Sequence, residues 1–100
     1  MARPFSSESA FRAVAHPTRR RILELVSRKP QSVAALVAEC RHGQPTVSRH
    51  LRVLYQARLI AFRGRGAKHM YEVVPGSLRT MRQWLDGVPV LTGQRRASRS

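Results

Sequence analysis

The sequence predicts a mainly helical domain that carries one small β-hairpin. From Ser6 to Leu54, apolar residues recur at spacings of three and four, with Pro and Gly between the runs, which indicates four short amphipathic helices. The apolar pattern then changes to two short stretches. Gly64 and Gly66 lie between them, which is typical of a hairpin. A last apolar stripe, Leu78 to Leu85, returns to helical spacing. The expected order is therefore four helices, two strands and one helix.

The first two helices are separated at His16 and Pro17. Ser6 or Ser7 can cap the first helix. Pro17 suits the first turn of the second helix because its missing N–H has no helical partner there, and His16 fits a cap better than a metal ligand. Lys29–Pro30 ends the second helix. The inward apolar residues are Phe11, Val14 and Ala15 in the first helix, and Ile22, Leu23 and Val26 in the second.

The third and fourth helices are joined by a very short turn. Ser32 caps the third, whose apolar stripe is Val33, Leu36, Val37 and Cys40. The fourth begins after Gly43 with Pro45 in its first turn, and its stripe is Val47, Leu51 and Leu54, with His50 at the edge. Two short helices with so tight a connection form a helix-turn-helix.

A hairpin follows directly. Its expected strands are residues 59–62 and 69–74, and Gly64 and Gly66 bracket Arg65 at a cationic tip with Lys68 beside it. Pro75, Gly76 and Ser77 start the last helix. The whole is a winged helix-turn-helix. We expect one DNA-binding and dimerisation domain over residues 1–91 and a disordered basic tail over residues 92–100.

The net charge of the chain narrows the class of partner that the protein is expected to bind. Nineteen Lys and Arg residues face five Asp and Glu residues, for a net charge of +14 in 100 residues. Self-repulsion of this size destabilises a small domain, so a polyanionic partner is expected. The apolar runs are too short to span a membrane, no secretory leader is evident, and Cys40 has no second cysteine to pair with. We expect a cytoplasmic, bacterial, nucleoid-associated protein.

The fourth helix has the strongest functional pattern. Opposite its apolar stripe lie only hydrogen-bond donors, cations and amides, with no acid: Thr46, Ser48, Arg49, Arg52 and Gln56. A helix of this kind fits the major groove of DNA, where Arg and Gln pair with base edges and hydroxyls reach phosphates. An ordinary solvated face is the alternative interpretation.

At the level of motifs, residues 11–86 resemble the ArsR family of winged helix-turn-helix repressors. The resemblance is carried by AHPTRRRILELV (15–26), SVAALVAEC (32–40), QPTVSRHLRVLYQARLI (44–60) and MYEVVP (70–75). The His-Pro-Thr-Arg-Arg start and SRHLRVL are the most specific pieces. The resemblance implies a homodimer, paired through the first and last helices, that binds a palindromic operator and usually represses.

The turn departs from the family pattern. Arg41, His42 and Gly43 stand where the family has Gly, an aliphatic residue and Ser. Arg41 would need a left-handed backbone at a cost on the order of 1 kcal/mol, and Gly43 is a weaker cap than Ser. We therefore expect an irregular turn with His42 pointing into the core.

No chemical site is evident. Metal-sensing family members carry clustered thiolates in the third helix or Asp and His ligands along the last, whereas here Cys40 is alone and Asp86 has no nearby His. Cys40 with His42 would supply two ligands, fewer than a zinc site needs, and Cys40 continues an apolar stripe, so we interpret it as core. No nucleophile, base and acid set is present. We predict no metal, no cofactor and no enzymatic activity.

These inferences give each candidate residue a role. We expect base contacts from Gln44, Thr46 and Arg49, and backbone contacts from Arg19, Arg20, Ser32, Ser48 and Arg52. His50 is expected to be half-buried packing or a phosphate contact. The wing would contribute Arg63, Arg65 and Lys68, with His69 either touching DNA or serving only as a strand residue. The dimer interface would contain Phe11, Val14, Leu78, Met81, Trp84 and Leu85.

The expected function is a homodimeric, sequence-specific transcriptional repressor of double-stranded DNA, and an autorepressor is one form it could take. Its inducer or regulatory partner is not predicted by the sequence. Two alternatives remain open: a sequence-indifferent nucleic-acid packing protein, suggested by the charge and the Arg-rich tail, and an adaptor whose stripe near Trp84 binds another protein.

Overall fold

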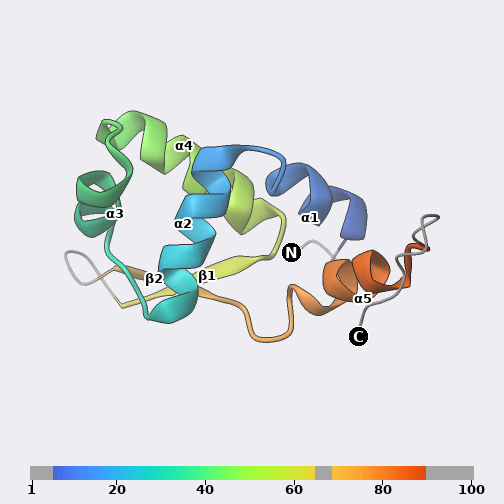
Figure 1. The fold of residues 1–100 in the computed structure, drawn as a ribbon. Coiled ribbons are helices and arrows are strands. Elements are labelled where there is room, and N and C mark those ends of the chain that lie inside the picture. The colour runs from blue at the N-terminus through green and yellow to red at the C-terminus, as the bar shows by residue number, and fades with distance from the viewer. Residues whose placement is uncertain (1–5, 65–68, 90–100) are drawn as a thin grey trace.

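The computed structural model describes residues 6–64 and 69–89, and it has the element order that the sequence predicts (Figure 1). Arg65, Lys68 and the tail expected over residues 92–100 lie outside the described residues. The elements are α1 (Ser7–Ala13), α2 (Pro17–Arg28), α3 (Val33–Cys40), α4 (Gln44–Gln56), β1 (Ile60–Arg63), β2 (Met70–Val73) and α5 (Arg79–Gly87).

The two ends of the molecule carry different elements. In Figure 1, α1 and α5 lie side by side at one end, whereas α3 lies at the other. Helix α2 runs between them and contacts α3, α4 and β2. Helix α3 therefore lies far from the pair formed by α1 and α5, whereas α4 contacts α1.

Local caps fix where three of the helices begin. The Ser6 hydroxyl accepts a hydrogen bond from Ser9 N at 3.3 Å, and the Ser32 hydroxyl accepts one from Ala35 N at 3.1 Å. His16 Nδ1 accepts from Thr18 N at 3.0 Å and so caps α2. Each acceptor satisfies an N–H group that has no partner within its helix. The predicted caps are confirmed.

The end of α1 is held by arginines of α2. Arg19 Nε donates to Ala13 O at 2.7 Å, and Arg20 Nη1 donates to Val14 O at 2.9 Å. Cationic donors suit these positions because the last carbonyls of a helix lack partners. Ala13 is buried here, whereas Ala15 is exposed, so the expectation that Ala15 faces inward is wrong. The helix ends before Ala15, which removes it from the apolar stripe.

Two non-glycine residues adopt left-handed backbone conformations. Arg41 ends α3 with φ 60° and ψ 30°, as expected from the sequence. Arg58 has φ 65° after α4, where its N–H donates to Tyr55 O at 3.0 Å and Leu59 N donates to Leu54 O at 3.1 Å. This pair of bonds is a Schellman motif. It turns the chain sharply from α4 into the hairpin.

His42 does not enter the core. Its side chain is exposed and its Nε2 lies 3.3 Å from Thr18 Oγ1, so the expectation of an inward His42 is wrong. The left-handed Arg41 closes the turn without an irregularity that would direct His42 inward, and the adjacent hydroxyl gives the imidazole a polar partner. This contact ties the turn to the first turn of α2.

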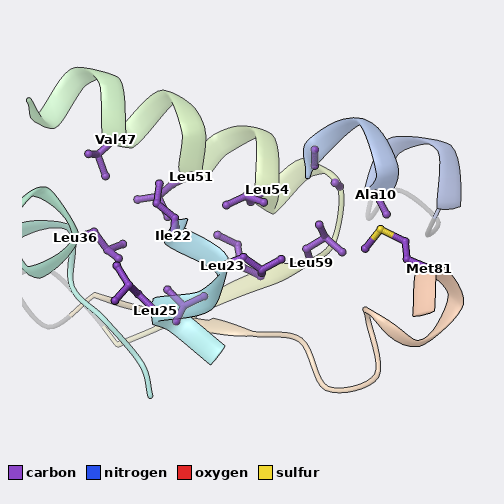
Figure 2. Packing of buried hydrophobic residues seen from close by; sticks show 14 residues of the cluster. Ala10, Ile22, Leu23, Leu25, Leu36, Val47, Leu51, Leu54, Leu59 and Met81 are labelled. Carbon is purple, nitrogen blue, oxygen red and sulfur yellow. The ribbon is translucent and has the colours of Figure 1, made fainter. Parts of the chain in front are cut away.

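One apolar cluster holds the elements together. Figure 2 shows Val47, Leu51 and Leu54 on α4 directed toward Leu36 and Ile22. All five side chains are at most 1% exposed, which confirms the predicted stripe of α4. This packing fixes one face of α4 to the core and leaves the opposite face to solvent.

The hairpin is antiparallel and is tied to the helices at its base. Ile60 pairs with Val73 and is buried in the cluster. Gln31, between α2 and α3, exchanges two backbone hydrogen bonds with Tyr71, at 2.8 and 2.7 Å. This isolated bridge, which the sequence did not predict, joins the segment before α3 to the outer edge of β2 and positions the start of α3.

Candidate nucleic-acid interface

The outer face of α4 is polar, basic and exposed. Gln44, Arg49 and Arg52 are exposed, whereas Thr46 and Ser48 are half-buried. A shallow hollow on this face is lined by Pro45, Ser48, Arg49 and Arg52. The fold thus brings three of the predicted DNA-contacting residues of α4 together.

The beginning of α4 adjoins α3. Gln44 lines a second hollow with Val33, Ala34 and Val37 of α3. Ser32, just before these residues, uses its hydroxyl oxygen as the cap of α3. Because a hydroxyl also carries a donor hydrogen, the Ser32 O–H can still donate to an anion. Gln44 and Ser32 therefore flank the same part of the helix-turn-helix.

The acidic residues lie away from α4. Four of the five pair with arginines on other elements: Glu8 with Arg12 at 3.2 Å, Glu24 and Glu39 with Arg21 at 3.8 and 3.3 Å, and Glu72 with Arg63 at 2.9 Å. These pairs are exposed and contribute little to stability. Because all four belong to other elements, they leave the positive charge of the outer face of α4 in place.

Arg19 has a structural role that the sequence did not predict. Besides its bond to Ala13 O, its Nη2 donates to Arg12 O at 3.4 Å, and its Nη1 lies 3.3 Å from His50 Nδ1. All three guanidinium nitrogens thus have partners within the protein, which makes Arg19 a poor candidate for a phosphate contact. Arg20 is more exposed and is the better candidate of the two.

His50 is half-buried, as expected, and packs on the cap of α2. Its imidazole ring lies 4.4 Å from that of His16, centroid to centroid. Burial lowers the pKa of His50, and the neighbouring His16, Arg19, His42 and Arg49 lower it further. The neutral imidazole is the form that this environment favours.

The described part of the wing carries both a cation and an acid. The Arg63 guanidinium is bound to Glu72 of β2, and it remains 68% exposed. His69 is exposed and its ring lies 4.7 Å from that of Phe62. A DNA contact by Arg63 would therefore compete with Glu72.

The residues expected at the dimer interface divide into two groups. Trp84 and Leu85 are each 60% exposed on α5, and Phe11 of α1 packs edge-on against Trp84 at 5.5 Å. Met81 is 6% exposed and belongs to the monomer core beside Ala10 (Figure 2). Since Met81 has little surface left to offer a partner, the exposed apolar face consists mainly of Trp84, Leu85 and Val88.

The remaining candidates for chemistry have simple environments. Cys40 packs against the apolar cluster, and burial raises the pKa of its thiol. Within residues 6–64 and 69–89, no three His, Cys, Asp or Glu side chains are grouped so as to hold a metal ion. Among the same residues, no helix has the length and apolarity to cross a membrane.

A helix-turn-helix with an acid-free outer helix, followed by a hairpin and a closing helix, defines a winged helix-turn-helix DNA-binding domain. The family comparison agrees, because the model of the bacterial regulatory proteins of the arsR family matches residues 16–61. The chain belongs to this arsR family of transcriptional regulators. The family predicted from the motifs is confirmed.

Individual relatives are transcriptional regulators and not enzymes. The chain is 37% identical to the HTH-type transcriptional regulator Rv2034 of Mycobacterium tuberculosis, over 81% of the chain and 76% of the relative. It is 32% identical to the arsenical resistance operon repressor of Staphylococcus xylosus, over 76% of the chain and 73% of the relative.

A solved structure has the same fold. The homodimeric winged helix-turn-helix DNA-binding domain Mb0332 of Mycobacterium bovis superposes with a TM-score of 0.68, at 18% identity, over 94% of this chain and 84% of the other. The predicted fold class is confirmed.

Proposed function

We propose that this regulator is a homodimeric repressor that recognises a palindromic operator in double-stranded DNA, at the nucleoid of a bacterial cytoplasm. The observation that carries the proposal is the outer face of α4, which is exposed, basic and free of acids. A helix with such a face can enter the major groove and present donors to base edges.

Base reading falls to residues near the start of α4. Gln44 and Arg49 are exposed: the Gln44 amide has the donor and acceptor that pair with adenine, the Arg49 guanidinium has the two donors that pair with guanine, and Thr46 lies between them. Ser48, Arg52, Ser32 and Arg20 are proposed to bind phosphates and to fix the position of α4 in the groove. The wing cations Arg63, Arg65 and Lys68 would bind the backbone or minor groove beside it.

The dimer is proposed to form through α1 and α5. An exposed tryptophan and leucine on one short helix form an apolar face that a monomer leaves in water. Because α1 and α5 lie away from α3 in Figure 1, pairing there leaves the helix-turn-helix accessible. Two copies would double the +14 charge and separate the two α4 helices by about 34 Å, one turn of DNA. The homodimeric state of the Mycobacterium bovis domain supports this proposal.

A selection experiment tests the proposed function. The purified protein is used to enrich duplexes from a randomised pool, and the enriched DNA is then footprinted. We expect an inverted repeat whose half-sites are about 10 base pairs apart, centre to centre. Enrichment without a shared sequence, together with continuous protection of the DNA, would instead support the alternative of a sequence-indifferent packing protein.

A further inference from the structure

Four aromatic side chains meet where α4 ends and the hairpin begins. Phe62 of β1 is the central one: its ring centroid lies 5.5 Å from Tyr55, 4.7 Å from His69 and 5.8 Å from Tyr71. Tyr55 belongs to α4, whereas His69 and Tyr71 belong to the returning side of the hairpin. We call Tyr55, Phe62, His69 and Tyr71 the aromatic seam.

Tyr71 packs against the apolar cluster, but two other members of the seam lie largely outside it. Phe62 is 43% exposed and Tyr55 is 46% exposed, so much of their apolar surface remains in water. The base of the hairpin is already fixed by the buried Ile60. The ring contacts of Phe62 occur further toward the tip, where Phe62 pairs with Tyr71 in the strand register. The separations fall within the roughly 4.5–7 Å at which aromatic rings attract one another.

The position of Tyr55 connects the seam to the DNA-facing surface. Tyr55 follows Arg52 by three residues and Ser48 by seven, so all three lie along one face of α4. Arg63 follows Phe62 in β1 and is a cation of the described hairpin. The seam thus joins the helix that carries Arg52 to the strand that carries Arg63.

We propose that Phe62 is a positioning residue, which holds the wing at a fixed angle to α4 so that both bind DNA as one rigid surface. The inference rests on the proposed function, because it assumes that the protein binds DNA. The salt dependence of DNA binding can nevertheless be measured on any duplex, without knowing the operator. Because the angle is already fixed in the free protein, the wing does not have to be ordered when DNA binds, and the entropic cost of that ordering is avoided.

The test compares Phe62→Ala with the triple charge variant Arg63→Ala, Arg65→Ala, Lys68→Ala. Removing one phosphate contact reduces the slope of log affinity against log salt by about 0.9, so the loss of Arg65 and Lys68 should reduce the slope of the triple variant by about 1.8, with a smaller further part from Arg63 because Glu72 competes for it. Phe62→Ala should also reduce the slope, by part of the amount seen in the triple variant, although it removes no charge. In the triple background it should cause no further reduction, because the cations that it positions are gone.

Matched variants separate positioning from folding. Phe62→Tyr and Tyr55→Phe keep the rings and should retain the wild-type slope, whereas Tyr55→Ala should reproduce the reduction seen for Phe62→Ala. Fluorescence of Trp84, the single tryptophan, reports on α5, where its ring packs against Phe11 of α1, and should not change.

Two results would overturn the proposal: an unchanged slope in both alanine variants, or a reduction that adds fully to that of the triple variant. The proposed repressor function fails separately: it is contradicted if the wild-type protein binds all sequences equally well. The slopes would still test the role of Phe62 in that case, because they can be measured on random DNA.

Discussion

The imidazole rings of His16 and His50 pack 4.4 Å apart and join the start of α2 to the middle of α4. Both rings use Nδ1 as a hydrogen-bond acceptor, His16 from Thr18 N and His50 from the Arg19 guanidinium. A protonated imidazole accepts no such bond. The hydrogen bond from Arg19 to His50 of α4 therefore requires the neutral form of His50.

This contact predicts a loss of stability in mild acid. The pKa of His50 is lowered below its ordinary value of about 6.5, first by burial and then by nearby cations, so the unfolded chain binds the proton more readily. The stabilisation is fully present above that value and is lost as pH falls through the lowered pKa. Urea unfolding between pH 7.5 and 5 should show a decreasing free energy of unfolding, and His50→Gln should reduce the decrease. A decrease as large in His50→Gln as in the wild type would contradict the assignment.

Arg49→Ala should reduce operator discrimination. If Arg49 reads a base, its loss costs about 1–3 kcal/mol on the operator and much less on random DNA. Fluorescence anisotropy at one salt concentration measures both. Arg28→Ala removes the same charge from an exposed position at the end of α2 and serves as the control. Equal losses on the two DNAs would show that Arg49 binds the backbone.

Glu72→Gln should tighten binding to every duplex. The carboxylate of Glu72 binds Arg63 at 2.9 Å, so a phosphate that binds Arg63 must compete with this carboxylate. Its removal frees Arg63 and should steepen the salt slope by up to about 0.9. Glu8→Gln, which removes an acid from α1, is the matched control. Equal or weaker binding in Glu72→Gln would place Arg63 away from the DNA.

Leu85→Asp should dissociate the proposed dimer without unfolding the monomer. Leu85 is 60% exposed in the single chain, so the substitution is tolerated there, but a charge buried without a partner in an interface costs about 3–5 kcal/mol. Sedimentation equilibrium should show a monomer with unchanged circular dichroism. Gln83→Asp adds the same charge to another exposed position of α5 and should remain dimeric. If the Leu85→Asp variant remained dimeric, the interface would have to lie on another part of the protein.

Local features of the sequence predicted most of the fold. Ser6, His16 and Ser32 cap helices through bonds to N–H groups two or three residues away, and such bonds depend only on nearby residues. The stripe of Val47, Leu51 and Leu54 likewise follows from helical spacing, and all three are buried. The left-handed Arg41 was predictable because the family has glycine there.

Contacts between distant residues could not be predicted in the same way. The Gln31–Tyr71 bridge joins residues that share no local pattern, and only the folded chain brings Arg19 to the end of α1 and to His50. The helical spacing of Met81 fits either an interface residue or a core residue. Only the folded chain, in which α1 packs against α5, shows that Met81 is buried in the core. Phe62 shows no sign in the sequence that its ring would meet Tyr55.

Sequence recognition by α4 requires the protein to bind two duplexes of different sequence with different dissociation constants. Anisotropy at one fixed salt concentration compares the selected inverted repeat with a scrambled duplex of the same length and composition. We predict that the protein binds the inverted repeat about 10³-fold or more tightly. Affinities that agree within a few-fold would contradict sequence recognition by α4.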